Sequence, residues 1–553
     1  MPKFNRTNLF TIFVSIILLQ SAVMYFCERA DLILSFLLEF VIIVFSLLFL
    51  PQHFLRRFIW FLYFCILGIQ TASIFSTGQY LVPLALSNAA EFAALGMASF
   101  IKTATVFIFY VLLSFLVFPG RIVSVKNNKQ IVIFFMGSML LFFTRGPLHE
   151  FFVTGKLFYM QATFKPNVKI AESGKEFLKN TIYSNESNGD FDFKKRNVIV
   201  IFTEGMSQEV IGHANGRDFS ITPNIDNYLK EGTSFSDYYN HTAATFRGLR
   251  GQLTSGYQYR DGVTNEGTGI DQLSSHDIND IYLNRQVTLP EILRVEGYKS
   301  YFIASTHKDS PLNTMLKTLN FDNVMGMGNF VGYQHDRMTD KQTFNALRDF
   351  LNATPQGEQP FFIGVYPSGT HHGQDSPNVK YGDGTNPYYN KFYNFDQQLG
   401  HFVEYFKKSR YYKNSILIIT ADHATYPSPE YKKSFNSKAV YFVNKIPFIL
   451  IGKDVKHQVI NVHGMNSLSL APTILQMLGV KYSMNYFLGC SLIDKGCSSP
   501  LSKASAIGDD YFITGDGDGD GDGDGDGDGV TLLPFTDAGS VKSEIKRFYN
   551  ISG

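Results

Sequence analysis

Five side chains that can bind metal follow apolar segments at three places in this 553-residue sequence. Glu204 follows NVIVIFT, His371 and His372 follow FFIGVYPSGT, and Asp422 and His423 follow SILIITA. Carboxylate oxygens combined with imidazole nitrogens suit Zn²⁺ or Mn²⁺. If the three segments are strands of one sheet, these side chains can form a metal centre.

The pattern between residues 195 and 480 predicts such a sheet. Short runs rich in Val, Ile and Phe that end in polar residues indicate buried strands. Between them lie stretches with a helical pattern: LPEILRVEGY, DKQTFNALRDFLNA and NFDQQLGHFVEYFKKS. Strands that alternate with helices predict an α/β fold around a largely parallel sheet. Ligands of such sheets bind beyond the carboxyl ends of the strands, so the metal-binding candidates should converge there.

The first 150 residues indicate a bundle of about five transmembrane helices. Spanning a bilayer takes roughly 20 residues of helix. Five segments are apolar enough, at about 8–26, 31–50, 57–76, 103–119 and 130–145. A further apolar stretch, 79–97, is interrupted by Pro83, Asn88 and Glu91, and we interpret it as a helix lying at the membrane interface. The first segment is too long, and too closely followed by others, for a cleaved signal peptide.

The distribution of Lys and Arg predicts the orientation of the bundle. Basic residues precede the first span and fill alternate loops: Lys3, Arg6, Arg56, Arg57, Arg121, Lys126 and Lys129. Loops of this kind stay in the cytoplasm. The N-terminus is therefore expected in the cytoplasm. An odd number of spans places everything after about residue 150 outside it.

Charge and cysteine content limit the partners and the compartment. The net charge is +1 and no strongly basic patch is present, so nucleic acid is not an expected partner. Cys490 and Cys497 lie close together in GCSLIDKGC. They could form a small disulfide loop, which would fit an oxidising compartment, or remain two unpaired thiols.

The segment TPNIDNYLKEGTSFSDYYNHTAATFRGLRGQLTSG resembles the sulfatase branch of the alkaline phosphatase superfamily. Further similar segments follow in the family's order over roughly 195–480: LPEILRVEGYKSYFIAS, LNFDNVMG, NFDQQLGHF, IITADHATY and SLSLAPTILQMLGV. With the preceding spans, the chain resembles lipoteichoic-acid synthase, related phosphoglycerol transferases and lipid A phosphoethanolamine transferases.

The resemblance implies a role for each candidate residue. Thr245 matches the nucleophile position, with Thr242 as the alternative. Glu204, Asp422, His423 and Thr245 would bind a divalent metal, Mn²⁺ or Zn²⁺. His372, followed by Gly373, resembles the histidine that contacts the reacting phosphate, and His371 is the alternative. Three more residues are candidate phosphate contacts: His463, Arg247 and Arg250.

The implied activity is transfer of a phosphate-linked head group through a phosphothreonine. A membrane phospholipid would donate phosphoglycerol or phosphoethanolamine to an extracytoplasmic glycan or lipid, at the inner (plasma) membrane of a bacterium. Phosphoethanolamine transferases usually carry several disulfides, whereas this chain has no Cys between 65 and 490, which favours phosphoglycerol. Two alternatives are a phosphodiesterase or sulfuric ester hydrolase of the same fold, and an inactive membrane scaffold.

These observations divide the sequence into five parts. Residues 1–150 form the transmembrane domain, 151–194 a connector and 195–510 the sulfatase-like catalytic domain. Residues 511–530 contain an alternation of Gly and Asp that cannot build a core, so a flexible acidic linker is expected. Residues 531–553 would be a C-terminal tail.

Overall fold

The structure is a computed structural model, and it divides the chain into two compact units. Unit 1 comprises Met1–Thr163 with Pro427–Glu430, and unit 2 comprises Phe164–Tyr426 with Tyr431–Gly553. The structure describes residues 6–27, 29–50, 53–81, 96–116, 132, 134, 136–137, 139–163, 191–257, 278, 286–330, 337–354, 359–480, 487–494, 496–497, 499–507, 510–516 and 530–534.

The described part of unit 1 is helical. Its main helices are α1 (Arg6–Phe26), α2 (Ile33–Phe49), α3 (His53–Thr77), α5 (Gly96–Leu116) and α7 (Pro147–Thr163). Two stretches are long and apolar enough to cross a bilayer, Ala30–Leu47 and His53–Ser76. Phe13–Phe26 and Ile101–Leu116 are shorter apolar helical stretches. The predicted basic loop 121–129 lies outside the described residues, as do most of the interfacial stretch 79–97 and part of the span 130–145.

A buried carboxylate in α2 has a structural role in unit 1. Glu39 is fully buried and accepts hydrogen bonds from the backbone N–H groups of Leu148 (2.8 Å) and His149 (3.1 Å). These groups belong to the first turn of α7, which has no intrahelical partner for them. Glu39 therefore caps α7 from a neighbouring helix, where its negative charge also suits the positive end of the helix dipole.

The described core of unit 2 is an eight-stranded sheet of order β4-β3-β5-β1-β6-β7-β2-β8. The strands are β1 (Asn197–Thr203), β2 (Thr233–Ser236), β3 (Lys299–His307), β4 (Asn323–Met327), β5 (Phe361–Tyr366), β6 (Ser415–Ala421), β7 (Phe448–Ile451) and β8 (Gln458–Asn461). All pair in parallel except β7, which is antiparallel to both β6 and β2. The largely parallel α/β sheet expected from the sequence is confirmed.

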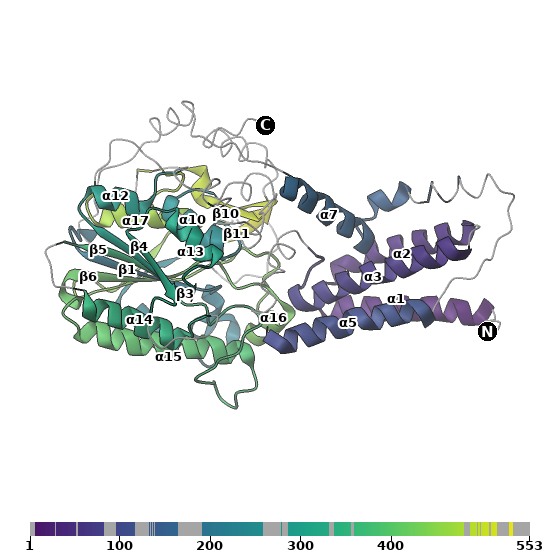
Figure 1. Cartoon of the computed structure of the whole chain (residues 1–553), viewed down its shortest axis with the longest axis horizontal. Helices are drawn as coiled ribbons and strands as arrows, with labels where there is room; N and C mark the ends of the chain where they lie inside the picture. Colours follow the sequence, from purple (N-terminus) through teal and green to yellow (C-terminus); the bar gives the residue numbers. More distant parts are fainter. Residues whose placement is uncertain are drawn as a thin grey trace, which may run out of the picture. The chain divides into compact units, whose positions relative to one another are not determined.

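Helices cover both faces of this sheet (Figure 1). One face carries α14 (Asp340–Ala353) and α15 (Pro387–Lys408), and α9 (Pro223–Glu231) packs on α15. The other carries α10 (Thr245–Thr254), α12 (Leu289–Val295), α13 (Pro311–Lys317) and α17 (Leu470–Met477). The central strands β1, β5 and β6 are buried along their whole length. Burial on both faces explains why they read as continuous apolar runs rather than as alternating ones.

A second, three-stranded sheet lies near the C-terminus. It has the order β11-β10-β9, from β9 (Ala504–Ile507), β10 (Asp510–Asp516) and β11 (Val530–Pro534). Asp516 pairs with Val530, so the two ends of the Gly-Asp repeat are held together in an antiparallel hairpin. Residues 517–529 of the repeat and the tail beyond 534 lie outside the described residues.

The two C-terminal cysteines are bridged. Cys490 and Cys497 form a disulfide across a separation of seven residues. Of the two possibilities that the sequence left open, the structure shows the bridge. A disulfide fits an oxidising compartment.

Candidate active site

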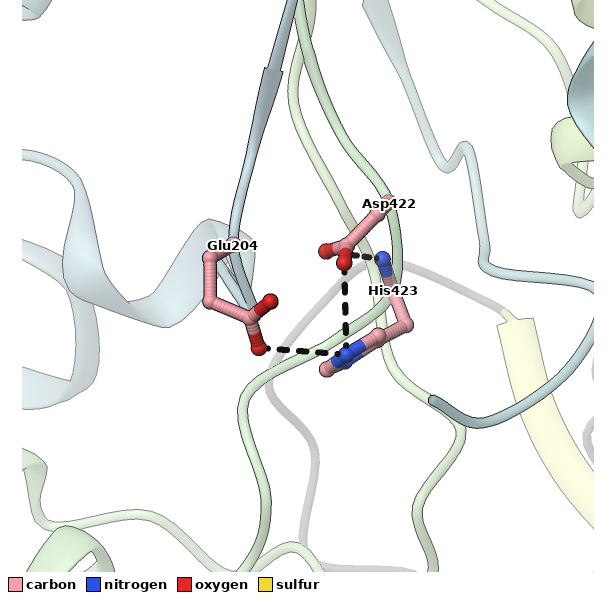
Figure 2. A group of neighbouring side chains, drawn as sticks. All are labelled: Glu204, Asp422 and His423. Atoms are coloured by element: carbon pink, nitrogen blue, oxygen red, sulfur yellow. Dashed lines mark hydrogen bonds and ion pairs between the residues drawn. The ribbon is translucent and has the colours of Figure 1, made fainter. Parts of the chain in front are cut away.

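Two neighbouring strands bring the three candidate metal ligands together. β1 and β6 pair in parallel, and the last pair in register is Thr203 with Ala421. The next residues, Glu204 and Asp422, therefore leave the same edge of the sheet side by side, and His423 follows (Figure 2). One ligand atom from each of the three residues lies within 4.8 Å of the others. Their convergence depends on a pairing between segments more than 200 residues apart.

The three side chains are buried and hold one another by hydrogen bonds and charge. His423 Nε2 lies 3.3 Å from Glu204 Oε1 and 3.5 Å from Asp422 Oδ2. Asp422 Oδ1 accepts hydrogen bonds from the backbone N–H groups of Gly205 and His423, both at 2.8 Å. Asp422 Oδ2 has no hydrogen-bond partner among the described residues. Its ion pair with His423 leaves this buried oxygen without a hydrogen bond from these residues, and a bound cation would give it a second positive partner.

The charges of this cluster are strongly coupled. Burial and the charge of Glu204 raise the pKa of Asp422 above its usual range. Burial also opposes ionisation of Glu204, but attraction to His423 lowers the pKa of Glu204 below its usual range. Burial disfavours the charged imidazole, yet Asp422 and Glu204 raise the pKa of His423 to about 9. Two carboxylates and one imidazole, with an acceptor left over, make a donor set that fits a divalent metal ion.

Thr245 faces this cluster from the first turn of α10. Its Oγ1 donates a hydrogen bond of 2.9 Å to Glu204 Oε2. The preceding residue, Ala244, has a φ of 69°, an uncommon value for a residue with a side chain, where the chain turns sharply into the helix. Thr242 instead pairs through its backbone with Ala506 and accepts a hydrogen bond from Asn240 at its carbonyl oxygen. The geometry thus favours Thr245 over Thr242, although its role as a nucleophile stays a prediction.

Two residues of α10 hold the helix against the end of β6, where the candidate ligand Asp422 lies. Gly248 packs so closely on the backbone of Asp422 that a Cβ there would collide with the Asp422 carbonyl oxygen. Gln252 donates hydrogen bonds to the carbonyl oxygens of Ala421 (2.9 Å) and Asp422 (3.1 Å). The glycine and glutamine in TFRGLRGQ therefore fix the distance between Thr245 and the candidate ligands.

The loop that follows β5 carries the two histidines. Thr370 anchors the loop, because its Oγ1 donates a hydrogen bond of 2.5 Å to the Glu204 carbonyl oxygen. His371 lies close enough to Glu204 to help lower the pKa of that carboxyl. His372 instead makes a 2.9 Å hydrogen bond with Tyr388 through Nδ1, and burial and the charge of Lys391 lower its pKa. The charge that acts on Glu204 is thus that of His371, whereas the sequence comparison favoured His372; both roles stay predictions.

The three predicted phosphate contacts are placed differently from one another. Arg247 and Arg250 are buried in α10, at about 200° and 140° around the helix from Thr245. Arg250 donates a 3.5 Å hydrogen bond to Thr318. His463 is exposed after β8, with a φ of 48°. Their roles stay predictions.

Tyr366 is a site residue that the sequence analysis missed. Its hydroxyl donates a hydrogen bond to Glu204 Oε2 and lies 3.5 Å from Thr245 Oγ1. Burial and the charge of Glu204 raise the pKa of Tyr366 well above its usual range, so the phenol is neutral. Tyr366 is the last residue of β5, and the rule that ligands bind at the carboxyl ends of strands could have identified it.

Comparison with known proteins identifies the family and the fold. The profile of the sulfatase family matches residues 196–480, just over half of the chain. The structure is similar to that of a protein in the alkaline phosphatase superfamily from Vibrio parahaemolyticus, with a TM-score of 0.51 and 19% identity over 71% of this chain and 93% of that one. This likeness shows the fold.

Two further solved structures are similar at lower scores. The lipoteichoic acid synthase LtaP from Listeria monocytogenes has a TM-score of 0.49 and 16% identity, covering 68% of this chain and 94% of that one. The C-terminal periplasmic domain of EcEptC from Escherichia coli has a TM-score of 0.39 and 17% identity, covering 57% of this chain and 90% of that one.

Proposed function

The chain belongs to the sulfatase family, and on this premise we propose that it is a metal-dependent transferase acting through a phosphothreonine. It would move phosphoglycerol or phosphoethanolamine from a membrane phospholipid to an extracytoplasmic glycan or lipid. One observation carries the proposal: the hydroxyl of Thr245, at the N-terminus of α10, donates a 2.9 Å hydrogen bond to a carboxylate of the candidate metal cluster.

Glu204, Asp422 and His423 would hold the metal ion, Mn²⁺ or Zn²⁺. The cation, when bound, supplies the positive charge that lowers the pKa of a nearby hydroxyl and stabilises negative charge on a phosphoryl group. Asp422 Oδ2, which makes no hydrogen bond to the described residues, is one acceptor that the ion could use. The hydrogen bond from Tyr366 holds Glu204 Oε2 on the side of Thr245.

The residues of this chain account for the first half of the reaction. Thr245 Oγ1, oriented by its hydrogen bond to Glu204 Oε2, attacks the phosphorus of the donor head group, and its proton passes to solvent. The bond between phosphorus and the diacylglycerol oxygen breaks. His371 supplies the proton that this oxygen takes up. His372, which its lowered pKa keeps neutral, can stabilise charge on the phosphoryl group by donating a hydrogen bond. The backbone N–H groups at the start of α10 help to neutralise charge on the phosphoryl oxygens.

An acceptor hydroxyl completes the transfer. It attacks the phosphorus of the phosphothreonine, the bond to Thr245 Oγ1 breaks, and the threonine recovers a proton. If water were the acceptor, the same site would be a phosphodiesterase. The identity of the second nucleophile therefore separates the transferase from the hydrolase.

Membrane placement is part of the proposal. We infer five spans near the segments predicted above, with the N-terminus in the cytoplasm of a bacterium and the catalytic unit outside the plasma membrane. The two long apolar stretches of unit 1 support membrane insertion, and the disulfide Cys490–Cys497 supports an oxidising compartment. The donor head group lies at the bilayer surface, so a tethered catalytic unit would meet it there.

The experiment that tests the function is intact-mass spectrometry of the full-length protein. The purified chain is loaded with Mn²⁺ or Zn²⁺ and incubated with phosphatidylglycerol or phosphatidylethanolamine. We expect a covalent adduct on Thr245 whose mass identifies the head group. Thr245→Ala should abolish both the adduct and turnover, whereas Thr242→Ala should keep both.

Two outcomes would contradict the proposal. Full turnover by Thr245→Ala would exclude this nucleophile. An adduct that is released only to water, at the same rate with and without glycan or lipid acceptors, would identify a hydrolase instead.

A further inference from the structure

A short surface segment beside the candidate centre combines exposed apolar and basic side chains. It follows α16 (Pro429–Phe435), and we call residues 436–442 the rim loop. Val440 is 61% exposed and Tyr441 is 38% exposed. Lys438 in the loop and Lys433 in α16 are exposed as well. Few large apolar side chains among the described residues of unit 2 are this exposed, so the pair calls for an explanation.

Both ends of the rim loop are fixed. At its start, Ser437 Oγ donates a 2.6 Å hydrogen bond to Glu209. At its end, the Phe442 carbonyl oxygen accepts a 3.0 Å hydrogen bond from Asn240, and the next residue, Val443, is buried. Residues 438–441 therefore lie between two anchored positions. The exposure of Val440 and Tyr441 is a consequence of how the loop is attached.

The rim loop also borders the candidate centre. The ring of Phe442 lies edge-on to the ring of His423, with 5.2 Å between their centroids. The ring of the adjacent Tyr441 lies 4.5 Å from that of Phe512. Whatever the loop tip contacts is thus brought next to His423. A lipid whose head group reacts at the centre would keep its acyl chains in the bilayer close by.

We propose that the rim loop is a membrane-contact element that docks on an anionic bilayer beside the candidate centre. Apolar side chains next to lysines are the composition of interfacial membrane-binding segments. Val440 and Tyr441 would enter the interface, while Lys433 and Lys438 would attract anionic head groups. The inference rests on the proposed function, because the contact would place the rim loop where the donor lipid lies.

The test uses the full-length protein in lipid nanodiscs. Cys27 and Cys65, the free cysteines among the described residues, are replaced by alanine, and Val440→Cys is labelled with an environment-sensitive fluorophore. With phosphatidylglycerol discs that contain a spin-labelled quencher lipid, we expect blue-shifted emission and strong quenching. Val295→Cys is the control, because Val295 is an 84% exposed valine of the same unit that lies between the opposite charges of Arg294 and Glu296; its label should not be quenched.

Three results would overturn the inference: equal quenching at positions 440 and 295, equal quenching at 440 in phosphatidylglycerol and phosphatidylcholine discs, or quenching that survives Lys433→Ser with Lys438→Ser. The outcome is separable from that of the proposed function. Quenching at 440 without an adduct on Thr245 would refute the transferase alone. An adduct without quenching would refute the membrane contact alone.

Discussion

At the scale of single residues, two carboxylate oxygens of the candidate centre differ in the hydrogen bonds that they accept. Asp422 Oδ2 is buried without a hydrogen-bond donor in the described residues, whereas Glu204 Oε2 accepts hydrogen bonds from both Thr245 and Tyr366. The first atom is suited to a cation, and the second connects the candidate metal ligands to Thr245. Substitutions at these two positions should therefore have different effects.

Asp422→Asn should sharply reduce metal binding. The change replaces a carboxylate, one of whose oxygens makes no hydrogen bond to the described residues, with a neutral amide. We therefore expect the metal affinity of the full-length protein to fall by roughly tenfold or more. Elemental analysis of protein dialysed against limiting Mn²⁺ or Zn²⁺ measures this. Asp396→Asn is the control, because Asp396 is also fully buried but caps α9. Unchanged metal stoichiometry in Asp422→Asn would refute its assignment as a ligand.

Tyr366→Phe should weaken metal binding and slow the reaction while leaving the fold intact. The variant loses only the hydroxyl that orients Glu204, and loss of such a supporting hydrogen bond costs roughly 10- to 100-fold in affinity or activity. The rate of adduct formation is measured at increasing metal concentration, and the concentration that gives half of the maximal rate should rise. Tyr411→Phe, whose hydroxyl bonds backbone carbonyl oxygens elsewhere, is the control. Identical metal dependence in both variants would exclude the orienting role.

At the scale of elements, the sequence predicted those parts of the fold that are encoded locally. β1, β5 and β6 are continuous apolar runs ending in polar residues, so their existence and the position of Glu204 and Asp422 could be predicted. The antiparallel direction of β7 and the short edge strand β8 depend on long-range pairing that no local pattern records. The contact of Tyr366 with Glu204 likewise depends on the pairing of β5 with β1.

Composition alone predicted the structure around the Gly-Asp repeat only in part. A linker was expected because Gly and Asp cannot build a core. The flanking residues, however, pair as β10 and β11, with Gly515 opposite Thr531. These strands are short and of mixed composition, so their pairing was not predictable from either strand alone.

The loop after β5 should respond to pH through a buried carboxyl that anchors it. Asp340, in the first turn of α14, accepts a 2.9 Å hydrogen bond from the Gly369 N–H, and burial raises its pKa to about 6. An unfolded Asp has a pKa of about 4. The folded protein therefore holds the proton of Asp340 more tightly than the unfolded chain does. The contribution of this proton to the free energy of unfolding is fully present below about pH 4 and is lost by about pH 6, a change of roughly 3 kcal/mol.

Asp340→Asn removes this titration. As the pH rises from about 4 to 6, the melting temperature of the wild-type protein should fall relative to that of Asp340→Asn. It should then stay constant at higher pH. Thermal unfolding of the full-length protein in detergent at several pH values measures the difference. A difference that does not change with pH would show that Asp340 titrates normally.

At the scale of the whole molecule, two units of different chemistry share one chain. Unit 1 contains apolar helices in which a carboxylate is used to cap α7, and unit 2 contains a sheet with a polar cluster at its carboxyl edge. Such a division makes sense if the reacting lipid is held in the membrane and the acceptor in the aqueous phase. The chemistry then requires the catalytic unit to lie on one defined side of the bilayer.

That side can be determined by labelling single cysteines in intact cells with a membrane-impermeant thiol reagent. Val459 is 63% exposed in unit 2, so Val459→Cys should be labelled from outside. Phe54 is 81% exposed at the start of α3, beside Arg56 and Arg57, so Phe54→Cys should be labelled only after the cells are permeabilised. Basic loops are retained in the cytoplasm, which is the physical basis of this difference. The reverse pattern would place the candidate centre in the cytoplasm and would exclude an extracytoplasmic acceptor.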